Sequence, residues 1–424
     1  MKHLLKIITA SILSLLARAV VHRYRPHVVM VTGSVGKTST KDAVAAVLAT
    51  RFYVRKSEKS FNSEFGVPFT ILGVDNPWGN PFAWFSVAAR AVTLLILPNH
   101  YPKMLVLEVG ADKPGDLARI LRMVTPDAVV VTRLPEVPVH VEAYASPEAV
   151  REEEFSPAYA LRAAAPLILS ADDPYALESA VRTPARIITY GNAKEAMVGI
   201  LAIDFAEEKE NVIGMHASIM VNGVREEVTV RGSVGRTQVY PIAAALAIAV
   251  AFDIPSVSAL TALEAYEPPA GRGRLFSGKN GSIIIDDTYN ASPIAVEKAL
   301  ETLTKFPHAK RRIAILGDML ELGRYSVTEH EHIGMVAREA VDLVLAVGIR
   351  ARVFASVAGR AEVMVFDDAK TAADAIIDLV HEGDLILVKG SQSIRMEHIV
   401  NALLADPSDI SRLVRQEIKW KKKV

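Results

Sequence analysis

The sequence predicts an α/β protein with two successive domains, each built around a mostly parallel sheet. Short, continuous apolar runs alternate with longer helical stretches, a pattern typical of strands that helices cover on both faces. The alternation stops at the proline-rich segment 267–271 and then restarts, which indicates a linker. We therefore expect a helix at 1–26, a central domain at 27–268 and a C-terminal domain at 269–424.

The buried apolar runs locate the strands. In the central domain these runs are 28–31, 104–109, 128–132, 167–170 and 186–190. Residues 198–231 differ, because apolar and polar side chains partly alternate there and turn at Asn222-Gly223, which predicts a small antiparallel flap. After the linker the runs are 282–286, 313–316, 343–347 and 385–388, and their alternation with helices predicts a Rossmann-like α/β domain.

The composition excludes several functional classes. The chain of 424 residues carries 48 Lys and Arg against 48 Asp and Glu, so its net charge is zero and we expect no nucleic-acid partner. It contains no cysteine, which excludes disulfides, thiolate catalysis and cysteine-ligated zinc. A reducing compartment is compatible with this composition, and we expect a cytoplasmic monomer.

Two apolar segments leave open how the protein relates to membranes. Residues 4–21 are mostly apolar but are interrupted by Lys6 and Arg18, and residues 82–97 form a second apolar stretch. The first segment is a helix packed on the next domain, an amphipathic helix on a membrane surface, or a span, for which it is short. A peripheral membrane contact through residues 1–25 therefore stays open, and the basic tail 419–423 is either solvated or in contact with anionic lipid.

The segment after the first strand has the composition of a phosphate-binding loop. It turns through Gly33 and Gly36 into a predicted helix, so that backbone N–H groups and the helix dipole face an anion. Lys37 adds charge and Thr38 can reach Mg²⁺, although the strict pattern would have a glycine at Val31. The central domain is therefore expected to be P-loop-type. The predicted nucleotide contacts are Gly33, Ser34, Val35, Gly36, Lys37, Thr38 and Ser39.

Polar residues follow other predicted strands of the central domain. Glu108 lies at the end of its strand, and ligands of open α/β sheets bind beyond the carboxyl ends of strands. Its carboxylate is placed to hold Mg²⁺ near the phosphates, and a solvated glutamate at a strand end is the equal alternative. His140 and Glu142 follow the next strand, and a lone histidine is more often structural than a ligand.

The C-terminal domain places further polar residues along one rim. Asp286 and Asp287 follow its first strand and suit ribose hydroxyls, Mg²⁺ or a cationic amine, or else they cap the next helix. Lys389 follows another strand and either binds an anionic group or is simply exposed. The remaining candidates on this rim are Asp318, His330 and Ser391.

Taken together, these segments resemble the Mur ligase family. The loop is similar to that family's ATP loop, and the segment from Asp286 resembles its D-D-x-Y-N-A-N-P motif. The resemblance covers about residues 28–405, in the family's order. The matching segments are 32–40, 61–68, 108–115, 140–146, 286–293, 316–323 with His330, and 389–391.

The resemblance implies an ATP- and Mg²⁺-dependent ligase that forms an amide bond through an acyl phosphate. The last motifs are most like the branch that joins D-alanyl-D-alanine to UDP-N-acetylmuramoyl-tripeptide in peptidoglycan synthesis. Lys37 would then hold the phosphates, Thr38 and Glu108 one Mg²⁺, and His140 a second. Arg272 and Asp287 would close over the nucleotide when the domains meet. The implied substrate contacts are Asn62, Asn290, Asp318, His330, Lys389 and Ser391.

Three features depart from the family pattern. About 30 residues precede the loop, where this branch carries a separate UDP-binding domain. The position of the family's carbamylated lysine holds Glu154, and we expect its carboxylate to replace the carbamate as a Mg²⁺ ligand. The alternative is an acidic helix face at 152–154. The usual G-x-H-N-x-x-N stretch reads 235–241 and lacks its His and Asn residues, which leaves Gln238 for base recognition.

These departures keep two other functions open. One is a ligase of the same fold that acts on a different acid, such as a folate-like or a non-nucleotide-linked peptide substrate. The other is an ATP-binding partner subunit that kept the phosphate loop and does not ligate.

Overall fold

The computed structural model describes residues 2–58, 62–77, 80–417 and 420, which form two compact units. Unit 1 combines Met1–Ala202, Ser218–Val228 and Tyr240–Tyr266. Unit 2 combines Ile203–Ala217, Thr229–Val239 and Glu267–Val424. Phe61 of the expected asparagine motif, and the basic tail 419–423 apart from Trp420, lie outside the described residues.

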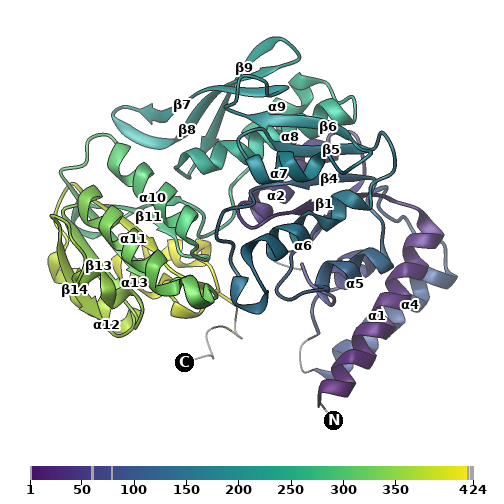
Figure 1. The fold of residues 1–424 in the computed structure, drawn as a ribbon, viewed down its shortest axis with the longest axis horizontal. Helices are drawn as coiled ribbons and strands as arrows, with labels where there is room; N and C mark the ends of the chain where they lie inside the picture. Colours follow the sequence, from purple (N-terminus) through teal and green to yellow (C-terminus); the bar gives the residue numbers. More distant parts are fainter. Residues whose placement is uncertain (1, 59–61, 78–79, 418–419, 421–424) are drawn as a thin grey trace. The chain divides into compact units, whose positions relative to one another are not determined.

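The larger sheet has nine strands in the order β2-β3-β1-β4-β5-β6-β7-β8-β9. Figure 1 labels β1 and β4 to β9 of this sheet. Strand β1 pairs in parallel with both β3 and β4, so that Val31 lies opposite Glu108. The loop after β1 therefore begins beside the carboxyl end of β3. The strands are β1 (His27–Thr32), β2 (Val54–Lys56), β3 (Met104–Glu108), β4 (Ala128–Val131), β5 (Pro166–Ser170), β6 (Arg186–Gly191), β7 (Val198–Glu208), β8 (Asn211–Val221) and β9 (Val224–Arg231).

The helices of this part of the chain cover the sheet. Strands β3 and β4 are buried along their whole length, which explains their unbroken apolar runs. The helices are α1 (Lys2–Tyr24), α2 (Lys37–Ala49), α3 (Gly66–Leu72), α4 (Pro81–Ile96), α5 (Asp116–Met123), α6 (Pro147–Tyr159), α7 (Pro174–Ala180), α8 (Val239–Ala251) and α9 (Ser256–Glu264).

Helix α1 packs on unit 1 as one of its elements. It contacts α3, α4 and α5, and Leu13, Ala17 and Val20 belong to the core cluster that also contains residues of β1, β3 and β4. Over the residues that the structure describes, we find no helix with both the length and the apolar character needed to cross a bilayer.

The predicted hairpin forms at Asn222-Gly223, between β8 and β9. Both residues have positive φ angles, 50° for Asn222 and 79° for Gly223, as a tight two-residue hairpin turn requires. Strands β7 to β9 continue the edge of the large sheet rather than forming a separate layer. The flap that the sequence predicts is therefore an extension of the parallel sheet.

Unit 2 contains a six-stranded sheet in the order β10-β11-β15-β12-β13-β14. Strands β10 and β11 are antiparallel, and the other pairs are parallel. The mixed α/β class with two sheets confirms the predicted fold class. The elements are β10 (Arg274–Ser277), β11 (Ile283–Asp287), β12 (Arg311–Gly317), β13 (Leu343–Val347), β14 (Glu362–Phe366), β15 (Asp384–Lys389), α10 (Pro293–Lys305), α11 (Ser326–Ala340), α12 (Ala369–Ile376) and α13 (Glu397–Leu403).

Candidate active site

The phosphate-binding loop is formed by two glycines with positive φ angles. Gly33 has φ +115°, and a Cβ there would lie 2.4 Å from Thr132 Oγ1 and 3.1 Å from the Thr132 backbone nitrogen, so a larger residue is disfavoured by both its backbone conformation and the segment after β4. Gly36 has φ +88° and is the N-cap of α2. The backbone N–H groups of the first turn of α2 are therefore directed at the loop, as an anion site requires.

Lys37 bends back over this loop. Its Nζ donates to the carbonyl oxygen of Gly33 and lies 3.9 Å from Glu154 Oε1. The lysine side chain is 16% exposed and the glutamate side chain 3% exposed. The ammonium group is thus partly accessible, and a buried carboxylate compensates its charge.

Glu154 is the one member of the acidic run that turns toward the loop. Glu152 is exposed and pairs with Arg182 at 2.7 Å. Glu153 accepts hydrogen bonds from the N–H groups of Gly115 and Leu117, at 3.1 and 3.0 Å, and so caps α5. The acidic face that the sequence offered as an alternative is therefore divided among three separate roles.

Burial and nearby polar groups act in opposite directions on the pKa of Glu154. Ser34 Oγ donates to Glu154 Oε2 at 2.5 Å. Burial raises the pKa of this carboxyl above its ordinary value, while Lys37, the Ser34 hydrogen bond and His140 act in the opposite direction. The carboxylate is therefore held in place by the two loop residues that face the phosphate position.

A second carboxylate, Glu108, reaches the loop from the end of β3. Thr38 Oγ1 donates to Glu108 Oε1 at 3.1 Å, and Glu108 is 2% exposed. Ser57, which sequence reasoning missed, accepts the Glu108 N–H at 3.1 Å and fixes the strand end. A hydroxyl and a carboxylate side by side are the hard oxygen donors that Mg²⁺ prefers, so these two residues fit the ion.

The metal site is incomplete when protein side chains alone are considered. Within the described ranges, no group of three or more His, Asp or Glu side chains is arranged to hold an ion. Mg²⁺ in nucleotide sites is usually held by one or two carboxylates together with substrate phosphates and water. The pairing of Thr38 with Glu108 therefore corresponds to the protein's share of such a site.

Asn62 and His140 lie at the margins of this group. A Cβ at Gly110 would be 3.0 Å from Asn62 Nδ2 and 3.4 Å from Lys37 Cε, so the bare glycine lets both side chains approach the end of β3. His140 has φ +68°, an uncommon conformation for a residue other than glycine. Its Nε2 lies 3.6 Å from Asp112 Oδ1, with the imidazole 30% exposed.

Unit 2 gathers a second group at the ends of β11 and β15. The two strands place Asp287 opposite Lys389, and Lys389 Nζ lies 2.7 Å from Asp287 Oδ2. The same ammonium donates to the Asn290 carbonyl oxygen at 2.9 Å. Lys389 is 1% exposed, and burial lowers its pKa while Asp287 raises it. The alternative of a solvent-exposed lysine is therefore wrong.

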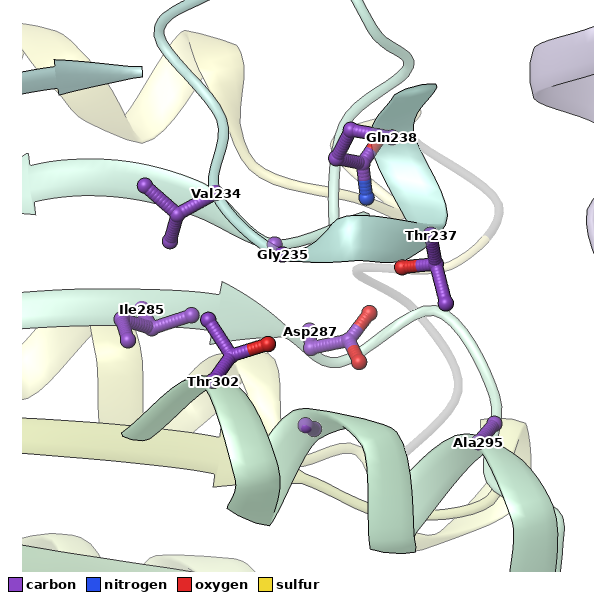
Figure 2. Close-up of a pocket in the computed structure, with 10 residues that line it drawn as sticks. Val234, Gly235, Thr237, Gln238, Ile285, Asp287, Ala295 and Thr302 are labelled. Atoms are coloured by element: carbon purple, nitrogen blue, oxygen red, sulfur yellow. The ribbon is translucent and has the colours of Figure 1, made fainter. Parts of the chain in front are cut away.

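A small pocket adjoins Asp287. Figure 2 shows its carboxylate facing the space below the turn that carries Thr237 and Gln238, with Thr302 of α10 on the other side. Gln238 is 7% exposed and borders this pocket. The glutamine that the sequence singled out for base recognition and the aspartate predicted beside the nucleotide thus line one cavity.

Arg272 is held near the same strand end. Its guanidinium lies 4.1 Å from the centre of the Tyr289 ring, and Gly271 O accepts the Tyr289 N–H at 3.1 Å. A stacked guanidinium keeps its N–H groups free for an anionic ligand. The linker residue is therefore positioned by the segment that also carries Asp287.

Asp318, His330 and Ser391 form a separate, internally satisfied group. Asp318 accepts from the N–H groups of Arg350 and Ala351, at 2.9 and 2.8 Å. His330 Nε2 accepts the Met319 N–H at 3.0 Å, and burial lowers the pKa of this imidazole. Ser391 Oγ accepts the Leu320 N–H at 2.9 Å. These three side chains hold the loop after β12, and their substrate contacts remain a prediction.

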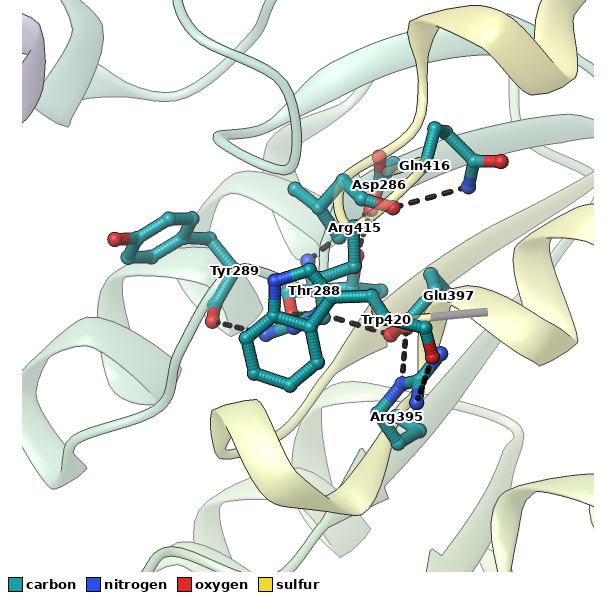
Figure 3. A network of polar contacts seen from close by, with 9 residues as sticks. Asp286, Thr288, Tyr289, Arg395, Glu397, Arg415, Gln416 and Trp420 are labelled. Carbon is teal, nitrogen blue, oxygen red and sulfur yellow. Dashed lines mark hydrogen bonds and ion pairs between the residues drawn. The ribbon is translucent and has the colours of Figure 1, made fainter. Parts of the chain in front are cut away.

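A buried network that sequence reasoning missed supports the Asp287 segment from behind (Figure 3). Arg415 donates to the carbonyl oxygens of Thr288 and Tyr289, at 3.2 and 2.6 Å, and to Glu397 Oε2 at 2.8 Å. The guanidinium carbon of Arg415 lies 6.0 Å from the centre of the Trp420 ring. Only the spacing of arginines near an aromatic residue in the tail could have signalled it, and that pattern has little specificity.

These arrangements match a known family. The model of the family described as "Mur ligase middle domain" matches residues 31–249, which make up more than half of the chain. The model of a second family, described as "Mur ligase, glutamate ligase domain", matches residues 271–392. The chain belongs to the Mur ligase family. It is therefore an ATP-dependent ligase that joins a carboxylic acid to an amino-acid nitrogen.

Relatives and solved structures agree with this membership. A UDP-N-acetylmuramoyl-tripeptide–D-alanyl-D-alanine ligase of Bacillus subtilis is 28% identical over 404 residues, covering 94% of this chain and 80% of the relative. The enzyme of that name in Mycobacterium leprae is 29% identical, covering 89% and 74%.

Two solved structures share the fold of this Mur ligase. A MurF ligase of Thermotoga maritima in complex with ADP has a TM-score of 0.76 at 24% identity, with 93% of this chain and 83% of that chain covered. A folylpolyglutamate synthase of Mycobacterium tuberculosis has a TM-score of 0.65 at 15% identity, covering 92% and 94%. At these identities the likeness extends to the fold and not to the substrate.

Proposed function

We propose that this Mur ligase adds D-alanyl-D-alanine to the peptide carboxylate of a UDP-N-acetylmuramoyl-tripeptide-like acceptor in peptidoglycan synthesis. The names of the relatives support this choice of substrates. The observation that carries the chemistry is the pair of buried carboxylates, Glu108 and Glu154, on either side of the phosphate loop at Lys37 and Thr38. We further propose that the enzyme acts as a monomer in the cytoplasm.

The first step is transfer of the terminal phosphoryl group of ATP to the acceptor carboxylate. Charge neutralisation and positioning supply most of the catalysis in such a transfer. Lys37 and the N–H groups at the start of α2 bind the phosphate oxygens, and Lys37 moves from Gly33 O to the phosphates. Thr38 and Glu108 would hold Mg²⁺, which supplies a positive charge next to the transferred group.

Glu154 takes the part that the resemblance assigns to a carbamylated lysine. Its carboxylate is present without any modification, and α6 brings it to the loop, where Ser34 and Lys37 hold it. We propose that this carboxylate fixes Lys37 before ATP binds and that it faces the metal and acceptor when the phosphates take over the lysine. His140, which acts electrostatically on this carboxylate, would hold a second Mg²⁺.

The acyl phosphate is then attacked by the amino group of D-alanyl-D-alanine. The nitrogen bonds to the carbonyl carbon, and the tetrahedral intermediate releases inorganic phosphate and a proton. We propose that Asp287, Gln238 and Arg272 bind the nucleotide from unit 2, and that Lys389 orients Asp287. The residues that we propose to contact the substrates are Asn62, Asn290, Asp318, His330 and Ser391. Closure of the two units over ATP would precede transfer.

Phosphate release and product mass together test this function. The purified chain is given Mg-ATP, D-alanyl-D-alanine and UDP-N-acetylmuramoyl-tripeptide, with Lys37→Ala as the matched control. Release of phosphate with a product heavier by one dipeptide residue supports the proposal. Turnover with another acid, such as a folate, would replace the substrate assignment. Nucleotide binding without acceptor-dependent phosphate release would point to a partner subunit that does not ligate.

A further inference from the structure

Helix α1 presents apolar side chains to solvent on the side away from its core. Ile8, Ile12 and Leu15 are exposed by 47%, 52% and 66%, and their spacing of four and three residues places them on one face. Leu13 and Ala17 lie on the opposite face, where they enter the core of unit 1. The helix therefore has two apolar faces, and the fold covers one of them.

Helix α4 repeats this arrangement. Phe82 and Phe85 are exposed by 85% and 75%, and Val92 and Ile96 continue the same face by helical spacing. On the opposite side, Leu94 is buried in the same core cluster as the inner face of α1. Exposed phenylalanines on a monomer's surface are uncommon, and several together indicate an interaction site.

The two helices lie side by side in unit 1 (Figure 1), and the inner faces of both enter the same core cluster, opposite their exposed faces. Tyr24 at the end of α1 donates its hydroxyl to the Leu94 carbonyl oxygen of α4 at 2.8 Å. Their common surface consists of the exposed apolar residues together with Leu97, which follows α4. We name it the α1–α4 surface: Ile8, Ile12, Leu15, Phe82, Phe85, Val92, Ile96 and Leu97.

The polar groups of α4 on this side make their hydrogen bonds within the helix. Ser86 Oγ donates to the Phe82 carbonyl oxygen at 3.3 Å, and Thr93 Oγ1 donates to the Ala89 carbonyl oxygen at 2.8 Å. A hydroxyl that is already bonded to its own helix loses little when water is removed from it. The face can therefore enter an apolar phase without leaving these groups unpaired.

Neither of the two helices carries an acidic side chain. Asp and Glu make up 48 of the 424 residues, yet none occurs in residues 1–41 or 77–103, which contain both helices. Arg18 and Arg23 on α1 are exposed, and Arg90 on α4 is half-buried. An apolar face on two helices that carry basic and no acidic side chains is complementary to a layer of anionic headgroups above hydrocarbon.

We propose that the α1–α4 surface binds the face of a bilayer that contains anionic lipids, with both helices lying in the plane of the interface. Phe82 and Phe85 enter the boundary between headgroups and acyl chains, and the arginines contact phosphate groups. The inner faces of the helices remain in the protein core. A docking face for another protein would be expected to carry charges of both signs, whereas α1 and α4 carry basic and no acidic side chains.

Co-sedimentation of the full chain with vesicles tests the proposal. The vesicles consist of phosphatidylcholine alone or of equal parts phosphatidylcholine and phosphatidylglycerol. One variant, Ile12→Ser with Phe85→Ser, removes apolar area, and a second, Arg18→Gln with Arg23→Gln, removes charge. The control, Val257→Ser with Ile349→Ser, changes two apolar side chains that are 76% and 77% exposed. They lie on α9 and after β13, outside the α1–α4 surface. Thermal unfolding confirms that each variant is folded.

We expect binding to the anionic vesicles that weakens with added salt. Each of the two surface variants should bind about tenfold more weakly or worse, while the control binds like the unmodified chain. All forms should keep their ligase turnover without vesicles, because none of these residues touches the proposed site.

Three results would overturn the proposal. The unmodified chain could stay in solution with both vesicle types, or the Ile12→Ser, Phe85→Ser variant could bind as well as the unmodified chain. The third is a dimer in size-exclusion chromatography that this variant converts to a monomer, with no vesicle binding by either form. That outcome would assign the surface to a second copy of the chain.

Discussion

Glu154 Oε1 lies 3.9 Å from Lys37 Nζ, and the two side chains are only 3% and 16% exposed, respectively. The other oxygen of the same carboxylate accepts the Ser34 hydroxyl at 2.5 Å. One buried side chain of α6 thus contacts two residues of the phosphate loop. This relationship is local to unit 1 and would persist in any arrangement of the two units.

The first prediction follows from this contact. Glu154→Gln keeps the shape of the side chain but removes its negative charge, so turnover should fall about 100-fold while nucleotide still binds. The concentration of Mg²⁺ that gives half-maximal rate should also rise, because a carboxylate near the metal is lost. Glu152→Gln, two residues away on the exposed side, is the control and should be unchanged. Full activity of Glu154→Gln would remove the role proposed for this carboxylate.

The ion pair of Lys389 and Asp287 gives a prediction about stability. Lys389→Met leaves the Asp287 carboxylate without its cation beside a buried strand end, and breaking such a pair lowers the free energy of unfolding by about 3 kcal/mol or more. Chemical denaturation followed by circular dichroism measures the change. Lys310→Met, which removes an exposed pair with Glu382, should leave the midpoint unaltered. Equal effects of both variants would contradict a special role for the buried pair.

The buried carboxyl group of Asp286 should make the stability of the protein depend on pH. Burial raises its pKa from 3.8 to about 6, and its Oδ2 has no hydrogen-bond partner in the described part of the chain. In this interval the folded protein binds more protons than the unfolded chain, so this group makes stability fall as the pH rises from about 4 to about 6. In Asp286→Asn this contribution is absent. Unfolding midpoints across the interval should decline less in the variant, and parallel curves would refute the assignment.

The C-terminal network offers a test of positioning. Arg415→Met removes the donors to the Thr288 and Tyr289 carbonyls and leaves Glu397 without one of its partners. We expect the KM for ATP to rise several-fold, because the segment that carries Asp287 loses its support. Arg415→Lys should not restore it, since a single ammonium cannot reach all three acceptors. Arg360→Met is the exposed control. An unchanged KM in Arg415→Met would confine the network to stability.

Much of this protein could be read from local pattern. The apolar runs located most strands, because a parallel strand covered on both faces needs a continuous apolar sequence. The loop could be recognised because glycine is needed where φ is positive, as at Gly33 and Gly36. Short or half-exposed strands such as β2 and β14 went unpredicted, because their sequences lack that continuous signal.

The sequence by itself determined the fold class, the family and the identity of the residues beside the phosphate loop, because these depend on order and spacing along the chain. Only the tertiary structure decided that Lys37 and Ser34 both hold Glu154, that Lys389 is buried against Asp287, and that α1 leaves one apolar face uncovered. The reason is physical: a side chain's charge state and partners depend on neighbours that are distant in sequence. Those neighbours are fixed only when helices and strands pack.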